Sequence, residues 1–86
     1  MATTLASSPW AYDLVRVDDG RLILTVVCGT VGLYELSLEL DVDEVAAWDR
    51  EGVPYIRDFA ALIAVHPSRF WPRHLGEASG ESHPPR

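Results

Sequence analysis

Few side chains in this 86-residue sequence are of the types that carry out nucleophilic or metal chemistry. Cys28, the only cysteine, ends the apolar run Leu22–Cys28. A reactive thiol needs a cationic neighbour that lowers its pKa; no histidine lies in that segment, so we expect a buried thiol. The histidines, His66, His74 and His83, are eight and nine residues apart, a spacing that places no two at metal-ligand distance on one helical face. We therefore predict no catalytic residue, no metal site and no cofactor.

Carboxylates are concentrated between residues 35 and 51, a stretch whose net charge of -6 equals that of the whole chain. Its acids could bind a divalent cation, but the glycine and the distal ligands of an EF-hand loop are missing. They could also act as paired carboxylates in hydrolysis, complement the N-terminus of a helix, or form a negative surface for a basic partner. The candidate acidic surface consists of Glu35, Glu39, Asp41, Asp43 and Glu44.

A second cluster combines aromatic and cationic side chains. Arg69, Phe70, Trp71, Arg73 and His74 lie within six residues of one another. Such a group could stack on a nucleobase or grip an acidic peptide. Adjacent residues cannot share one face, so we expect one of the two aromatic rings to close the core and the other to be half exposed, as an interface anchor.

The elements that must position these residues begin with β-structure. Trp10–Val17 and Arg21–Cys28 flank Asp18-Asp19-Gly20, and Asp-Gly is a strong signal for a two-residue hairpin turn. This turn would pair Val17 with Leu22 and Val15 with Leu24. Gly32–Leu40 alternates apolar and polar residues, which predicts a third strand. An odd-length loop before this strand groups the apolar side chains on one face and brings Arg21 opposite Glu39.

The second half of the chain has helical patterns. Asp41 followed by Glu44 is typical of a capping box, and Gly52 is a C-terminal stop. Pro54 suits the first turn of a second helix, in which Ile56, Phe59, Ala60 and Ile63 form a core stripe. His66-Pro67 ends that helix, and one short helical turn can follow. We predict an α+β fold, a three-stranded antiparallel β-meander followed by two α-helices (βββαα) packed on one sheet face.

Three segments differ in composition. Residues 1–9 are small and polar and predict a flexible lead-in, residues 10–75 hold nearly all the large apolar side chains of one globular domain, and residues 76–86 predict a disordered tail. Residues 1–9 also lack the features of a secretory signal, and no apolar run is long enough to span a membrane. With a single cysteine, we expect a cytoplasmic protein.

The outer face of the predicted sheet is a third candidate surface. Its apolar members gather toward one end, and they are Trp10, Tyr12, Leu14, Ile23, Val27 and Leu33. An apolar patch with a polar rim on so small a domain favours a partner or a second copy of the chain, unless another segment covers it. Together with the C-terminal cluster, the candidate partner surface is Trp10, Tyr12, Val27, Leu33, Arg69, Phe70, Trp71 and Arg73.

The net charge of -6 disfavours general nucleic-acid binding and attachment to anionic lipid. All seven basic residues are arginines, which favours a GC-rich bacterial source. The leading hypothesis is a small acidic, non-enzymatic protein–protein interaction module of regulatory or neutralising type, able to form a homodimer and to bind a basic partner. One alternative is an enzyme or ligand binder whose pocket, with His66, His74 or Asp58, is completed across a dimer. Another is a nucleic-acid binder that uses Arg69, Trp71 and Arg73.

Overall fold

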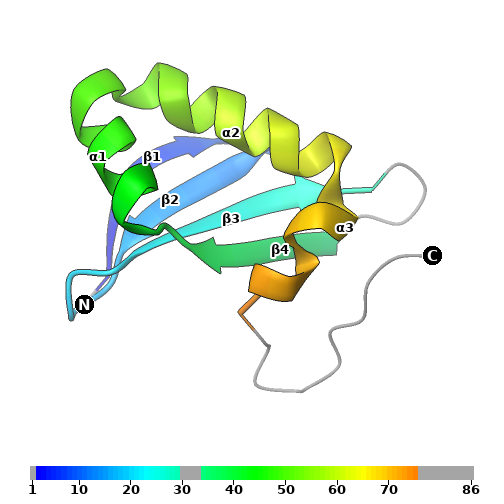
Figure 1. The fold of residues 1–86 in the computed structure, drawn as a ribbon, viewed down its shortest axis with the longest axis horizontal. Helices are drawn as coiled ribbons and strands as arrows, with labels where there is room; N and C mark the ends of the chain where they lie inside the picture. Colours follow the sequence, from blue (N-terminus) through cyan, green and yellow to red (C-terminus); the bar gives the residue numbers. More distant parts are fainter. Residues whose placement is uncertain (1, 30–33, 76–86) are drawn as a thin grey trace.

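A four-stranded antiparallel sheet is the base of the structure, a computed structural model that describes residues 2–29 and 34–75 (Figure 1). The strands are β1 (Thr3–Ser8), β2 (Tyr12–Arg16), β3 (Leu22–Cys28) and β4 (Tyr34–Glu39), and each pairs with the next along the chain. Three helices follow, α1 (Val42–Glu51), α2 (Val53–Val65) and the short α3 (Pro67–Phe70), before the 3-10 turn η1 (Trp71–Arg73). The predicted α+β class with an antiparallel sheet is therefore confirmed, with one strand more than predicted and with α3 in the place where the sequence allowed one short helical turn.

The additional strand is β1, which lies in the segment interpreted as a flexible lead-in. It pairs with β2 from Thr3 opposite Arg16 to Ser8 opposite Tyr12, with a bulge between Thr4 and Ala6. An edge strand needs few large apolar residues, and here Leu5 and Ala6 alone pack against the core. The small, polar residues of this segment therefore form a strand that the composition did not predict.

The β2–β3 hairpin differs from the prediction by one residue. Its loop has three residues, because the Val17 N–H donates to the Arg21 carbonyl while the Gly20 N–H donates to the Val17 carbonyl. Gly20 has a φ of 93°, the left-handed conformation that ends a three-residue hairpin loop. Leu24 consequently lies opposite Leu14 rather than Val15. A slip of one residue exchanges the faces of β2, so Tyr12 and Leu14 point inward.

The β3–β4 pairing has the predicted faces but not the predicted register. Leu24 lies opposite Leu38 and Val26 opposite Leu36. The predicted pairing of Arg21 with Glu39 would instead place Leu24 opposite Leu36, which is two residues nearer to the β3–β4 loop. A shift of two residues keeps every side chain on its own face. Arg21 still reaches Glu39, diagonally, at 3.5 Å between Nη1 and Oε1. The loop that joins these strands, residues 30–33, lies outside the described residues.

The helices begin and end where local signals predict. The Asp41 carboxylate accepts a hydrogen bond from the Glu44 N–H at 2.9 Å, and the Glu44 carboxylate accepts one from the Asp41 N–H at 2.8 Å, which completes the capping box. Gly52 ends α1 with a φ of 72°, and Pro54 lies in the first turn of α2. The stripe of α2 is buried at Ile56, Ala60 and Ile63, and Phe59 is partly buried between Tyr55 and Phe70.

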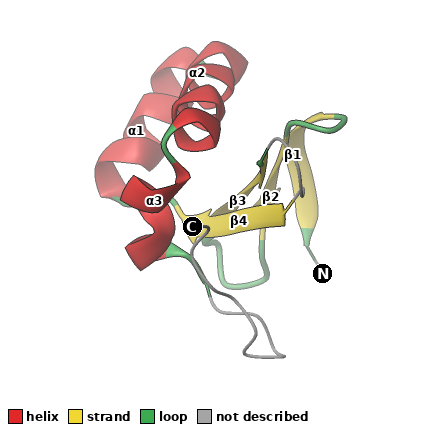
Figure 2. Cartoon of the chain, turned by 90° about the vertical axis from the view of Figure 1, so that its right-hand side faces the viewer, coloured by secondary structure: helices red, strands yellow, loops and turns green. Residues whose placement is uncertain are grey.

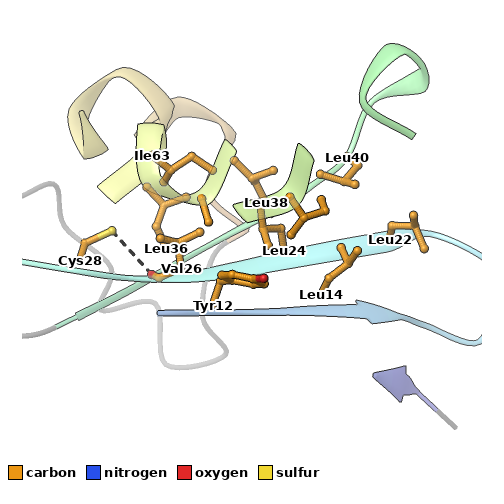
Figure 3. Close-up of a cluster of buried hydrophobic side chains, with 12 residues drawn as sticks. Tyr12, Leu14, Leu22, Leu24, Val26, Cys28, Leu36, Leu38, Leu40 and Ile63 are labelled. Carbon is orange, nitrogen blue, oxygen red and sulfur yellow. Dashed lines mark hydrogen bonds between the residues drawn. The ribbon is translucent and has the colours of Figure 1, made fainter. Parts of the chain in front are cut away.

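The core lies between the helices and the inward face of the sheet (Figure 3). Leu14, Leu24, Leu36 and Leu38 are completely inaccessible to solvent, and Tyr12 is 7% exposed. No buried polar or charged residue occurs in the described part of the chain. The hydrophobic effect of this single layer is therefore the main stabilising contribution to the fold.

The chain after α2 returns to the free edge of β4. The Leu75 N–H donates to the Ser37 carbonyl at 2.7 Å, and the Ser37 N–H donates to Nδ1 of His74 at 3.1 Å. These bonds cap part of an edge that would otherwise expose unpaired backbone groups. Residues 76–86, predicted to be disordered, lie outside the described residues.

Candidate binding surface

One face of the sheet has no helix against it in the described part of the chain. Figure 2 shows the helices gathered on the opposite face. Strand register assigns the side chains of the uncovered face, because directly paired residues point the same way. We call it the open face, and its residues are Thr4, Ser7, Asp13, Val15, Ile23, Thr25, Val27, Glu35, Ser37 and Glu39.

The open face combines a β-branched centre with acidic margins. Val15, Ile23 and Val27 are half-buried, whereas Glu35 and Glu39 on the outer strand β4 are exposed. The Ser7 hydroxyl donates to the Asp13 carboxylate, and the hydroxyls of Thr25 and Ser37 lie 2.8 Å apart. This surface is therefore more polar than the apolar outer face that the sequence predicted.

The difference follows from the register of β2. Tyr12 and Leu14, predicted on the outer face, point into the core instead, although Tyr12 also borders a pocket beside Trp10. Their neighbours Asp13 and Val15 take the outward positions instead. Val27 and Ile23 do lie on the open face, and Leu33 lies outside the described residues.

Trp10 lies in the turn that joins β1 to β2, at one end of the sheet, where it borders a pocket on the open face and a second pocket against α2. The Ala11 N–H donates to the Ser8 carbonyl at 3.0 Å, which closes a four-residue turn with Pro9 and Trp10 at its centre. Trp10 has a φ of 64°, a left-handed conformation that is normally left to Gly or Asn at this turn position. Its side chain is 85% exposed, the largest value among the large apolar residues described. A bulky residue in this conformation is unusual, and strained backbone conformations cluster at functional sites.

A pocket of about 390 Å³ lies beside Trp10. Thr25 and Val27 of β3 line it together with Tyr34, and its charged lining residues are Asp13 and Glu35. Burial raises the pKa of the Tyr34 phenol, which therefore stays neutral at physiological pH. The pocket thus offers aromatic surface and two carboxylates, with no basic residue among the side chains that line it.

The C-terminal aromatic and basic cluster serves largely to hold the fold together. Phe70 packs edge-on against Phe59, and Trp71 stacks on His74, with ring centroids 4.4 Å apart. Both aromatic rings are partly buried against the core, whereas the sequence predicted one core ring and one half-exposed ring; their part in a partner surface stays a prediction. Arg69 is exposed and lies 6.0 Å from the centroid of the Phe70 ring.

Arg73 forms a two-pronged ion pair with Glu44. Its Nη1 and Nη2 donate to the two carboxylate oxygens of Glu44 at 2.8 and 2.6 Å, and Nη2 also donates to the Glu39 carbonyl at 2.9 Å. The hydrogen bonds to Glu44 raise the pKa of Arg73 above its ordinary value. With Arg73 engaged in this way and Trp71 stacked internally, the predicted nucleic-acid group of Arg69, Trp71 and Arg73 retains one cation that faces solvent.

The acidic stretch divides into two parts with different roles. Asp41 and Glu44 cap α1, and Glu44 also binds Arg73; Asp43 is exposed in the first turn of that helix. Glu35 and Glu39 lie on the open face instead. Only these two of the five predicted acidic residues share a surface with Val27 and the Trp10 pocket.

The other candidates for chemistry are dispersed. Cys28 is 2% exposed, its thiol donates to the Val26 carbonyl at 3.6 Å, and burial raises its pKa. His66 ends α2, His74 is on the β4 edge, and Asp58 pairs with Arg57. No group of three or more His, Cys, Asp or Glu side chains that could hold a metal ion occurs within residues 2–29 and 34–75. An enzyme site completed across a dimer stays a prediction.

Comparison with known proteins identifies no relative of this chain. No protein-family model matches the chain, and no curated protein or solved structure matches it significantly. Among the described helices, none is both long enough and apolar enough to cross a membrane. The function must therefore be inferred from the surface itself.

Sequence reasoning named several residues of this surface but assigned them to separate groups. Trp10 and Val27 were expected in an apolar patch and Glu35 in an acidic stretch, whereas the structure places all three around one pocket. Asp13 and Tyr34 were missed as site residues. Asp13 is the only charged residue of β2 before Arg16, between the inward Tyr12 and Leu14, so the correct hairpin register would have placed it outward.

Proposed function

We propose that this chain is a non-enzymatic protein–protein interaction module, of regulatory or neutralising type, whose partner is a basic protein that docks on the open face of the sheet. The observation that carries the proposal is Trp10, an 85% exposed indole held in a left-handed backbone conformation at the end of that face. Tryptophan is among the residues most enriched at the energetic centres of interfaces.

The composition of the open face supports a protein partner. Half-buried β-branched side chains at Val15, Ile23 and Val27 supply apolar area, and Thr25 and Ser37 supply hydroxyl groups within the same face. A centre of this kind with a polar margin is the usual anatomy of a specific interface.

The charge supports a basic partner in particular. Asp13, Glu35 and Glu39 lie on the open face of a chain whose net charge is -6. Complementary charge accelerates association and excludes partners of the same sign. We propose that the chain acts in the bacterial cytoplasm, as its composition and its single cysteine suggest.

The test compares two lysine substitutions in a quantitative capture experiment. Thr25→Lys places a cation in the centre of the open face, whereas Val65→Lys places the same cation on α2, where Val65 is 70% exposed. Both variants should fold, because both positions reach solvent. We expect wild type and Val65→Lys to retain the same basic protein from a lysate of the source organism, and Thr25→Lys to lose it.

The interaction must then be reproduced with the purified partner. Equal retention by Thr25→Lys and Val65→Lys would show that the open face is not the docking surface. Retention of acidic proteins or of nucleic acid alone would refute a basic protein partner.

A further inference from the structure

We propose that the pocket beside Trp10 receives the side chain of one arginine from that basic partner, with the guanidinium group stacked on the indole and hydrogen-bonded to Asp13 and Glu35. This inference rests on the proposed function and specifies its central contact. Three properties of the pocket carry it: the exposure of the indole, the placement of the carboxylates, and the absence of a basic residue from the lining.

The turn holds the backbone of Trp10 in one conformation, and the indole extends from it into solvent. Pro9 sets the first central position of the turn, and the hydrogen bond from Ala11 to Ser8 closes it, so the backbone of Trp10 has little freedom. Because Gly would adopt a φ of 64° without strain, the tryptophan side chain brings a conformational cost at this position. The indole makes no ring contact with another aromatic residue described here. Tryptophan is also the best of the three aromatic rings for binding a cation on its face.

The carboxylates approach the pocket from two sides. Asp13 comes from β2 and Glu35 from β4, with β3 between them. The two residues lie two strand spacings apart across the sheet, about 10 Å, and are offset by two residues along β3, about 7 Å. Thr25, opposite Asp13, and Val27, opposite Glu35, form the floor between them. A guanidinium group at the centre of this span can hydrogen-bond toward both margins, since it carries five N–H donors in a planar fork.

The chemistry of the pocket favours arginine over the other side chains. An anionic side chain would meet two carboxylates, and a neutral apolar side chain would bring no positive charge to either of them. Lysine carries its charge as a compact, strongly hydrated group, whereas guanidinium is planar, stacks on aromatic faces and loses its hydration more readily. A volume of about 390 Å³ accommodates one long side chain, since it lies near the lower end of the ~300–1,000 Å³ range of small-ligand pockets.

A second copy of the chain is a poorer occupant than a basic partner. Each copy carries a net charge of -6, and docking on this face would bring the Asp13, Glu35 and Glu39 side chains of both copies near each other. Like charges placed together across an interface are unfavourable. We therefore assign the arginine to a different, basic protein.

The experiment is a titration of the full, isotope-labelled chain followed by nuclear magnetic resonance. The probes are the peptide acetyl-Gly-Gly-Arg-Gly-Gly-amide and its citrulline analogue, which has nearly the same shape and no charge. With the arginine peptide we expect shifts of the Trp10 indole N–H and of the backbone amides of Asp13, Val27 and Glu35. We expect binding of the citrulline peptide to be weaker by at least about tenfold.

Three variants test the assignment. Trp10→Gly removes the indole but suits the turn, because Gly prefers the left-handed conformation, so it should remain folded. The double variant Asp13→Asn with Glu35→Gln removes both charges at nearly constant shape. Both of these variants should bind the arginine peptide at least about tenfold more weakly than wild type does. The matched control is Asp49→Asn with Glu51→Gln on α1, which removes two exposed charges elsewhere and should bind like wild type.

The outcomes separate this inference from the proposed function. Equal binding of the arginine and citrulline peptides, or binding that survives Trp10→Gly, would overturn the arginine pocket. In that case a longer basic peptide that still shifts Val15 and Ile23 would leave the open face as the docking surface. If neither the arginine peptide nor the longer basic peptide shifts the amide signals of any open-face residue, both proposals are wrong.

Discussion

Arg73 shows how one side chain joins three parts of this small fold. It extends from the η1 turn to the Glu44 carboxylate at the start of α1 and to the backbone of β4 at Glu39. The Arg73 side chain is 34% exposed and that of Glu44 only 14%, so the pair is partly shielded from water. A two-pronged, shielded ion pair of this kind stabilises a fold more than an exposed pair does.

We predict that Arg73→Ala lowers the free energy of unfolding by about 1–2 kcal/mol, because three hydrogen bonds are lost and Glu44 is left without its cation. The matched control is Arg57→Ala, since the Arg57 and Asp58 side chains are 66% and 76% exposed. It removes the same charge and should change stability by less than about 0.5 kcal/mol. Urea unfolding of both variants provides the measurement. Equal losses would mean that only the overall charge matters.

A second prediction at the residue scale concerns Cys28. Its thiol is almost fully buried, and burial raises its pKa. We therefore expect it to react with a thiol reagent at least about 100-fold more slowly in the native protein than in urea, because a reactive thiolate requires both exposure and ionisation.

The same shift makes stability depend on pH. An unfolded thiol ionises near a pKa of about 8.5, whereas the folded thiol keeps its proton to higher pH. The contribution of Cys28 is therefore fully present below about pH 8.5 and declines as the pH rises above that value. Cys28→Ala should show a smaller decline between about pH 7 and pH 9.5. A decline as large as that of wild type would assign the effect to other groups.

At the scale of the elements, β1 is the least expected feature, and its packing is directly testable. Leu5 and Ala6 contact the core from this edge strand, while Thr4 points to the open face. We predict that Leu5→Ser lowers the free energy of unfolding by about 1–2 kcal/mol through lost apolar burial. Thr4→Ser should change it by less than about 0.5 kcal/mol. If the segment were a loose lead-in, both substitutions would be neutral, and its amides would exchange with solvent unprotected.

The elements that could be predicted from the sequence are those defined by local patterns. The alternation from Tyr34 to Leu40 marks β4 and its buried face, and the Asp41–Glu44 pair marks the start of α1. Both signals lie within a few residues of the element that they define. Their physical cause, side-chain periodicity or a cap, does not depend on the rest of the fold.

The features that could not be predicted depend on turn geometry. Asp18, Asp19 and Gly20 fit a loop of two or of three residues, and the choice decides whether Tyr12 or Asp13 faces the core. The sequence did not predict the β1–β2 turn, because Trp10 occupies the position where Gly or Asn usually indicates a left-handed backbone conformation. The pocket beside Trp10 depends on both turns, so only its separate residues could be recognised beforehand.

At the scale of the whole molecule, the distribution of charge governs association. The chain carries a net charge of -6, and three of its carboxylates lie on the open face. Two copies that meet on this face would repel each other, whereas a basic partner would be attracted. Salt screens both effects, because the Debye length falls from about 30 Å at 0.01 M to about 10 Å at 0.1 M ionic strength.

The two modes of association must therefore respond to salt in opposite directions. We predict that the chain is monomeric at low ionic strength, that any dimer formed on the open face becomes more abundant as salt is added, and that binding of an arginine-rich peptide becomes weaker over the same range. Light scattering behind size exclusion measures the fractions of monomer and dimer, and fluorescence anisotropy of a labelled peptide measures peptide binding. Thr25→Lys, which adds a positive charge to the face, should make dimerisation less sensitive to salt and weaken peptide binding. A dimer that is most abundant at low salt and dissociates as salt is added would be held together by opposite charges. Such a dimer would have to form on another surface, where arginines such as Arg50 or Arg57 contact acidic residues of the second copy.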